Sequence, residues 1–165
     1  MATKLIIITD VHANLPALTA VLEAARQEGC DGIVHTGDAI GIGPFPAECL
    51  ALLLETPQLE CVMGNHDAWF AEGLPDPPPA GMDDGEVRHQ QWTHQAIDPV
   101  WRARVAAWPY CITWEVEGVR TSFLHYALEP PGQEFAPVVR DPSAAALDAL
   151  FAPHASAVIF YGHSH

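Results

Sequence analysis

The feature that most constrains this fold is an alternation of short apolar runs with amphipathic segments in the first part of the chain. The runs are rich in β-branched residues and predict buried strands, at residues 4–9 (KLIIIT), 32–36 (GIVHT) and 59–63 (LECVM). The segments between them predict helices, at residues 14–29, with Asn14 as cap and Gly29 as stop, and 46–55. This order predicts a parallel sheet with helical crossovers.

The rest of the chain reads as a proline-rich loop followed by a second set of elements. Residues 73–85 (GLPDPPPAGMDDG) predict an extended loop, which is either a plain linker or a lid on the substrate side. Further predicted elements are a helical stretch at 86–108 broken near Asp98-Pro99, a hairpin at 110–126 turning at Glu117-Gly118, a helix at 141–151 capped by Asp141 or Ser143, and a strand at 157–162. We expect residues 1–165 to form one domain.

Composition excludes several classes of function. The net charge is −14, and the chain has seven basic side chains against 21 acidic ones, so we expect no nucleic-acid surface and no anionic-membrane surface. No apolar run approaches the ~20 residues of a membrane span or forms a signal-peptide core, which favours a cytoplasmic protein. The four cysteines form no C-x-x-C pair, so we interpret them as small buried hydrophobic residues.

Polar side chains follow each predicted strand directly. They are Asp10 and His12 in TDVHAN, Asp38 in TGDAIG, Asn65, His66 and Asp67 in MGNHDA, His125 in SFLHYA, and His163 and His165 in YGHSH. Ligands of open α/β sheets bind at the carboxyl ends of the strands, so these side chains are candidates for one site. Mixed oxygen and nitrogen donors suit manganese, iron, zinc or a similar divalent metal. They are too many for one tetrahedral ion and suit two ions that share a carboxylate.

Each motif also has a plainer interpretation when it stands alone. An Asp after a strand is an ordinary turn or cap residue, a lone histidine is common at a strand end, and the terminal GHSH reads as a frayed end. Their order, with each motif at the end of a strand, favours a site over five unrelated features.

In that order the motifs D-x-H, G-D-x-x-G, G-N-H-D, a lone His and G-H-x-H resemble the calcineurin-like metallophosphoesterases. The resemblance runs from Asp10 to His165 and implies an αββα four-layer sandwich. Residues 10–23 and 37–53 resemble the bacterial branch that holds small phosphodiesterases and diadenosine-tetraphosphatase-like enzymes. Members of the family usually continue past G-H-x-H, so we expect C-terminal strands to be missing after His165, or an unusually short variant.

The resemblance also implies roles for the candidate residues. Asp10, His12 and His165 would bind a first metal ion, Asn65, His125 and His163 would bind a second, and Asp38 would bridge them. We expect two divalent ions, with manganese first and iron, zinc, nickel or cobalt as alternatives. Such a pair lowers the pKa of a shared water, and hydrolysis would proceed through a metal-bridging hydroxide.

Catalytic roles fall on His66 and Asp67. By resemblance, His66 protonates the leaving-group oxygen or stabilises the transition state. Nearby cations would lower its pKa, so it needs a partner, and Asp67 is one candidate. Alternatively Asp67 is a carboxylate at a helix N-terminus. The protein phosphatases of the family read G-D-x-x-D-R, where this chain has Gly41 and Ile42, so the usual partner of the catalytic histidine is missing.

The predicted function is metal-dependent hydrolysis of a small phosphodiester or nucleotide-like phosphate ester. A phosphomonoesterase and a non-catalytic scaffold on the same fold are the alternatives. The histidines outside the motifs are interpreted structurally: His35 as part of a buried strand, and His89 and His94 as helix surface, with the lining of a lid as the alternative for these two. Tyr126 is interpreted as a core residue, with contact to a base or sugar as the alternative. The sequence leaves the oligomeric state open.

Overall fold

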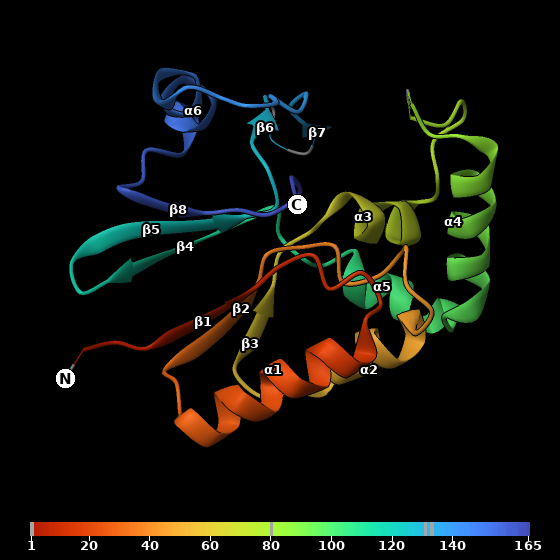
Figure 1. The fold of residues 1–165 in the computed structure, drawn as a ribbon, viewed down its shortest axis with the longest axis horizontal. Helices are drawn as coiled ribbons and strands as arrows, with labels where there is room; N and C mark the ends of the chain where they lie inside the picture. The colour runs from red at the N-terminus through yellow and green to blue at the C-terminus, as the bar shows by residue number, and fades with distance from the viewer. Residues whose placement is uncertain (1, 80, 131, 133) are drawn as a thin grey trace.

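Two three-stranded sheets stacked face to face form the centre of the molecule (Figure 1). The computed structural model describes residues 2–79, 81–130, 132 and 134–165. The first sheet is parallel and contains β1 (Leu5–Ile8), β2 (Gly32–His35) and β3 (Leu59–Cys61). The second contains β4 (Cys111–Val116), β5 (Val119–Leu124) and β8 (Val158–Phe160), with β5 antiparallel to β4 and parallel to β8.

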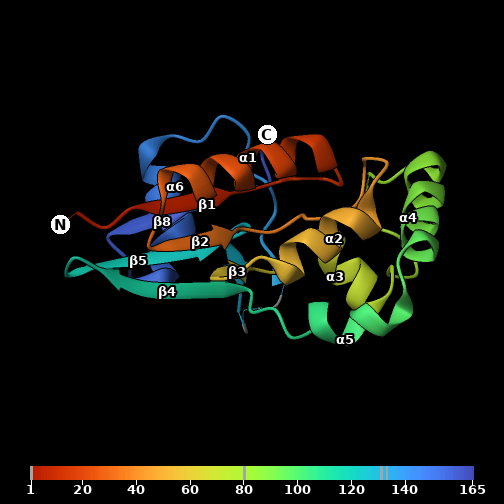
Figure 2. The same cartoon turned by 90° about the horizontal axis from the view of Figure 1, so that it is seen from below.

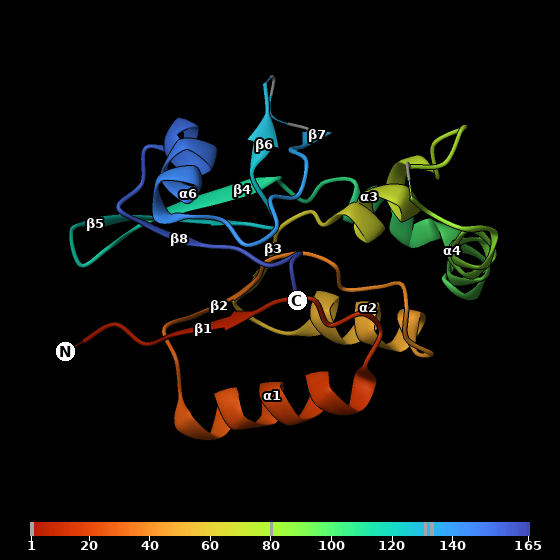
Figure 3. The same cartoon turned by 45° about the horizontal axis from the view of Figure 1, so that its top comes forward.

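Helices cover both outer faces of the stacked sheets. Helices α1 (Leu15–Glu28) and α2 (Pro46–Glu55) lie against the first sheet, and α6 (Ala144–Phe151) lies against the second (Figure 3). The layers therefore run α–β–β–α, which confirms the predicted four-layer sandwich. None of the helices in the described residues combines the length and the apolar character needed to cross a bilayer.

A group of further helical elements flanks one end of the sandwich (Figure 2). It contains α3 (Asn65–Glu72), α4 (Asp84–Ala96), the 3-10 turn η1 (Pro99–Trp101) and α5 (Arg102–Val105). On the other side, near α6, lie the 3-10 turn η2 (Ala152–His154) and a short ladder of β6 (Leu128–Glu129) and β7 (Glu134–Phe135). The active-site candidates lie between these two groups.

Apolar side chains between the layers explain why the sheets stack. Val34, Val62, Ile112 and Phe123 are buried between the two sheets. The ring of Phe123 is fully buried and lies 5.0 Å from Trp114 and 5.5 Å from Phe160, centroid to centroid. A separate cluster, which includes Leu18 and Leu50, fills the space between the first sheet and its helices. The β-branched runs of the sequence thus form strands that are covered on both faces.

Most predicted element boundaries are confirmed, and the differences have local causes. Asn14 caps α1 by accepting a hydrogen bond from the Ala17 N–H at 3.2 Å, and Glu117-Gly118 turns the hairpin with both residues at positive φ. Ser143, rather than Asp141, caps α6. Helix α4 begins at Asp84, which shortens the proline-rich loop, and Ala80 of that loop lies outside the described residues. The short strands β6 and β7 were not predicted.

Candidate active site

All seven predicted metal ligands lie at the carboxyl ends of the strands. Six of them, together with His66, form three overlapping groups, each with its donor atoms within 4.8 Å of one another: Asp10, His12 and His165; His12, Asp38 and His66; and Asp38, His125 and His163. Asn65, the first residue of α3, joins the third group, with its Oδ1 atom 3.1 Å from His125 Nε2. The strand-end pattern in the sequence therefore corresponds to one compact cluster in space.

His125 shows most clearly that this cluster suits a cation. Its Nδ1 lies 3.0 Å from the carbonyl oxygen of Thr36, which can only accept, so Nδ1 carries the proton. When this ring is neutral, its Nε2 lone pair faces His163 Nδ1 at 3.0 Å, Asn65 Oδ1 at 3.1 Å and Asp38 Oδ2 at 3.3 Å. Facing lone pairs repel unless a positive charge lies among them. Nitrogen and oxygen donors at these spacings fit around one ion with bonds of roughly 2.0–2.2 Å.

A second set of donors converges beside the first. His12 Nε2 lies 3.2 Å from His165 Nε2 and 3.7 Å from Asp10 Oδ1. The backbone N–H of His163 donates to the Asp10 carboxylate at 3.0 Å, which holds the C-terminal segment against the end of β1. The His165 side chain is 62% exposed, whereas that of His125 is fully buried. The two donor sets therefore differ mainly in their access to solvent.

Asp38 lies between the two donor sets. Its Oδ2 atom is 3.3 Å from His125 Nε2 and 3.7 Å from His12 Nε2, and its Oδ1 atom accepts a hydrogen bond from the His66 N–H at 2.9 Å. Burial alone would raise the pKa of Asp38, but the hydrogen bond and charge of His125 lower it, and the net shift is downward. Asp38 is thus an ionised carboxylate with one oxygen directed at both sets, as a bridging ligand requires.

The electrostatics of the histidines fit this arrangement. Burial lowers the pKa of His12 and that of His163, which favours the neutral rings that can bind a metal. Burial would also lower the pKa of His125, but the Asp38 carboxylate raises it and the net shift is upward. Positive charge is therefore favourable at the centre of the buried donor set.

Backbone conformation concentrates strain at the same residues. Among the described residues, ten that are not glycine have positive φ, and four of these are predicted ligands: Asp10 (50°), His12 (44°), Asp38 (58°) and His163 (73°). Such conformations are uncommon for residues with a Cβ and cluster at functional sites. The surrounding structure thus holds these four side chains in place at a cost in local backbone energy.

Glycines allow the ligand-bearing loops to touch. Gly37 has a φ of 100°, and a Cβ there would lie 2.8 Å from both Gly64 Cα and His125 Nδ1. Since real Cβ contacts are longer, a side chain at residue 37 would push the loop that carries Asp38 away from the loop that carries Asn65. The glycines of the G-D and G-N-H-D motifs are therefore needed for close approach.

His66 has a partner that the sequence did not predict. The side chain of Gln90, on α4, is hydrogen-bonded through Nε2 to His66 Nδ1 and is only 2% exposed. With the amide donating to Nδ1, the proton of a neutral His66 ring lies on Nε2. Burial is the main cause that lowers the pKa of His66, to about 4. The ring lies 4.8 Å from Trp69 and 5.0 Å from His12, centroid to centroid.

Asp67 corrects one expectation. Among the hydrogen bonds of the described residues it makes none to the His66 ring, so it is not the partner proposed for that histidine. Its fully buried carboxylate instead accepts from the backbone N–H groups of Asp38 at 2.8 Å, Ala39 at 3.1 Å and Gly64 at 3.1 Å. Burial raises its pKa to about 7, although these donors oppose the shift. This matches the alternative, a carboxylate in the first turn of a helix.

The residues outside the motifs lie largely where the sequence placed them. His35 and Tyr126 are buried, at 0% and 2% exposure. His94 packs against Phe70, with the ring centroids 5.8 Å apart. His89, interpreted as helix surface with the lining of a lid as the alternative, lines a cavity that also contains His66 and residues of the proline-rich loop.

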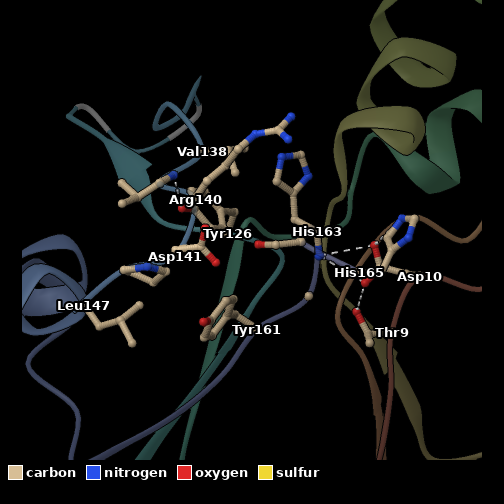
Figure 4. A pocket seen from close by; sticks show the side chains of 14 residues that line it. Thr9, Asp10, Tyr126, Val138, Arg140, Asp141, Leu147, Tyr161, His163 and His165 are labelled. Carbon is tan, nitrogen blue, oxygen red and sulfur yellow. Dashed lines mark hydrogen bonds and ion pairs between the residues drawn. The ribbon is translucent and has the colours of Figure 1, made fainter. Parts of the chain in front are cut away.

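Two cavities adjoin the cluster, one on each side. The first, on the α6 side, has a volume of about 850 Å³, and Figure 4 shows Asp10, Tyr126, Arg140 and His163 around it. The second has a volume of about 550 Å³ and lies between α3, the loop before α4, and α4. His66, Trp69, Met82 and Gln90 line it. The donor cluster thus lies between two spaces of small-molecule size.

Comparison with known proteins decides the family. The sequence model of the calcineurin-like phosphoesterase superfamily domain matches residues 3–165. The chain belongs to this superfamily. A crystal structure of a metallophosphoesterase from Sphaerobacter thermophilus is 28% identical and matches with a TM-score of 0.73 over 100% of this chain and 62% of that one. Hypothetical protein PH1004 from Pyrococcus horikoshii OT3 matches in fold, with a TM-score of 0.77 at 16% identity, over 96% of this chain and 68% of that one.

A curated relative is similar over a shorter stretch. Protein MJ0912 of Methanocaldococcus jannaschii is 43% identical over 61 residues, which is 37% of this chain and 25% of that protein. The chain thus spans about a quarter of that relative and less than two thirds of the Sphaerobacter structure. Family membership rests on the match over residues 3–165.

Replacing Asp67 should weaken the fold rather than only the chemistry. In Asp67→Asn, an amide NH₂ replaces one oxygen that accepts backbone N–H groups, leaving buried donors without partners. We expect a loss of about 2–4 kcal/mol in the free energy of unfolding, measured by urea denaturation. Asp84→Asn, at an exposed carboxylate in the first turn of α4, is the control and should change stability by less than about 0.5 kcal/mol. An equally small effect at Asp67 would contradict this role.

Proposed function

We propose that this protein hydrolyses a small phosphodiester or nucleotide-like phosphate ester with the help of two divalent metal ions. The observation that carries the proposal is the pair of converging donor sets that share Asp38, with the His66 ring beside them. Membership of the calcineurin-like phosphoesterase superfamily supports the reaction class. A small phosphate ester is the proposed partner, and the acidic composition argues against a nucleic-acid surface.

The donor chemistry fits the metal ions that the family implies. Asp10, His12 and His165 would hold one ion, and Asn65, His125 and His163 the other, with Asp38 between them. Bound there, two divalent ions would lower the pKa of a bound water and neutralise charge on the phosphoryl oxygens. Manganese is the first expectation, because the mixed carboxylate, amide and imidazole donors suit it.

The protein's own groups would orient the substrate and handle a proton. His66 Nε2 is the ring nitrogen not bonded to Gln90, and it would donate a hydrogen bond to the leaving-group oxygen and so stabilise the negative charge that develops there. Asp38 fixes the His66 backbone through the hydrogen bond at 2.9 Å, and Gln90 fixes its ring. A nitrogen held at both the backbone and the ring can donate in one direction without reorganisation.

The two cavities favour a diester over a monoester. A phosphodiester carries two organic groups, and one space lies on each side of the donor cluster. The larger one has Arg140 in its wall, which could pair with an anionic group of the substrate. A monoester has one organic group and would fill only one of the two cavities.

Metal titration tests the proposed pair of ions. Metal-depleted protein titrated with Mn²⁺ should bind two ions per chain, more weakly at the set containing His165, because that side chain is exposed and must be ordered on binding. Calorimetry should show that His165→Ala removes only the weaker event and His125→Ala the tighter one. Electron paramagnetic resonance of the loaded wild type should show coupled Mn²⁺ ions. A single ion per chain would contradict the proposal.

Turnover tests the reaction. With Mn²⁺ and bis(4-nitrophenyl) phosphate, Asp38→Asn and His66→Ala should each lower kcat by at least ~100-fold, because they remove the bridging charge and the proton donor. His154→Ala, at a histidine of η2 that lies outside the donor groups, is the control and should retain activity. Wild-type protein that binds metal but hydrolyses neither monoesters nor diesters would favour the non-catalytic alternative.

Gln90 should act as a positioning residue. Gln90→Ala removes the hydrogen bond to His66 Nδ1, so kcat should fall by about 10–100-fold while KM changes little. Gln90→Glu places a carboxylate that can accept a hydrogen bond from Nδ1–H of the protonated ring, which also carries a proton on Nε2, and should restore part of kcat. Gln91→Ala, at the exposed neighbour on the same helix, is the matched control. Equal kcat values for Gln90→Ala and Gln91→Ala would exclude the role.

A further inference from the structure

We propose that the cavity beside His66 receives the leaving group of the ester, and that this leaving group is an uncharged alcohol with a flat ring rather than a phosphorylated one. We call this space the His66 cavity and define it by His66, Trp69, Met82, Gln90, Ile42 and Glu86. The inference rests on the proposed phosphoesterase function and adds the chemical class of the group that leaves.

The position of the cavity assigns its occupant. The leaving-group oxygen must come within hydrogen-bond reach of His66 Nε2, so the atoms attached to it must extend past that ring. The space on that side is the His66 cavity, which is lined by residues of α3 and α4. The larger cavity lies on the opposite side of the cluster and remains for the second ester group.

The lining selects against negative charge. Trp69, Met82 and Ile42 give the cavity apolar walls, and its described lining residues include Glu86 but no lysine or arginine. A nucleoside diphosphate leaving group would place several negative charges against these walls without a lysine or arginine to pair with, which is unfavourable. Arg88 is exposed and does not line the cavity.

Size and shape agree with a ring. A volume of about 550 Å³ lies within the roughly 300–1,000 Å³ of typical small-molecule sites. The Trp69 ring system and the Met82 thioether are surfaces against which aromatic rings pack favourably. An aryl alcohol, or the base and sugar of a nucleoside, therefore matches both the volume and the lining.

Ile42 provides an independent sign that this wall is functional. It is a β-branched residue at φ 62°, which is a strained conformation, and its side chain is nevertheless 58% exposed. Packing within the protein does not account for this, since the side chain is largely uncovered. A Cβ at the preceding Gly41 would collide with the His66 ring, so the loop runs directly along that ring. Ile42 thus presents an apolar surface next to the proton donor.

Matched substrates test the charge preference. Two diesters would share the same non-leaving group and have 4-nitrophenol or a carboxylated nitrophenol of similar acidity as leaving group. Wild-type kcat/KM should favour the neutral ring by about tenfold or more. Glu86→Gln keeps a side-chain oxygen that can accept the hydrogen bond from the Asp83 N–H at the start of α4. Because it removes the negative charge, it should reduce the preference in kcat/KM for the neutral ring by about 2–5-fold. Glu23→Gln, on α1, is the control. A preference for the carboxylated ring would overturn the proposal.

A substitution at Ile42 tests the apolar wall. Asparagine tolerates the left-handed conformation, so Ile42→Asn should fold at least as stably as the wild type while making the wall polar. KM for the neutral aryl diester should rise by about 5–10-fold. Val100→Asn, at an apolar side chain that is 67% exposed on η1, is the control. An unchanged KM in Ile42→Asn would count against the proposal.

A binding measurement separates this inference from the proposed function. 4-Nitrophenol added to metal-depleted protein should shift the backbone amide resonances of Trp69, Met82 and Gly85, and the shifts should weaken in Ile42→Asn. These shifts without turnover of any ester would leave the cavity assignment standing and remove the proposed function. Turnover with shifts only at residues of the larger cavity would remove the cavity assignment and leave the proposed function standing.

Discussion

The site depends on one buried carboxylate that binds no substrate. Asp67 accepts backbone N–H groups from Asp38, Ala39 and Gly64, and so joins the loop after β2 to the loop after β3. The first loop carries the shared carboxylate and the second carries Asn65 and His66. The loops can approach this closely because Gly37 and Gly64 have no side chains. Without Asp67, the two loops would lose the hydrogen bonds that hold their metal-donor side chains at fixed positions relative to one another.

The arrangement of strands in the sandwich brings the other donor-bearing loops together. Parallel strands β1, β2 and β3 end at one edge, and β5 and β8 of the second sheet end beside them, so five loops meet there (Figure 1). Core packing between the sheets, centred on Phe123, fixes the second sheet relative to the first. The positive φ values of Asp10, Asp38 and His163 show that the loops bend sharply as they leave the strands. Stability of the sandwich offsets that strain.

The sequence predicted which side chains gather at the site because each follows a strand, and strand direction is encoded locally. It placed Asp67 wrongly for a geometric reason. His66 and Asp67 are consecutive in α3. Consecutive side chains of a helix point about 100° apart, so they seldom form a hydrogen bond with each other. Gln90 could not be predicted, because only the packing of α4 against α3 brings it to His66. A buried glutamine in a helix leaves no pattern in a single sequence.

The partner of the His66 ring in this chain is Gln90 rather than an acidic residue of the second motif, and this change would link the proposed catalysis to selectivity for the leaving group. Where the resembling phosphatases have an acidic residue in the second motif, this chain has Gly41, whose lack of a Cβ leaves room for the His66 ring, and Gln90 reaches that ring from α4. The same helix also supplies Glu86 and His89 to the wall of the His66 cavity. If the protein acts as proposed, the position of α4 sets both the direction of the His66 hydrogen bond and the space open to the leaving group. A change that moved α4 would then alter the two together, so the rate and the choice of leaving group would not be independent.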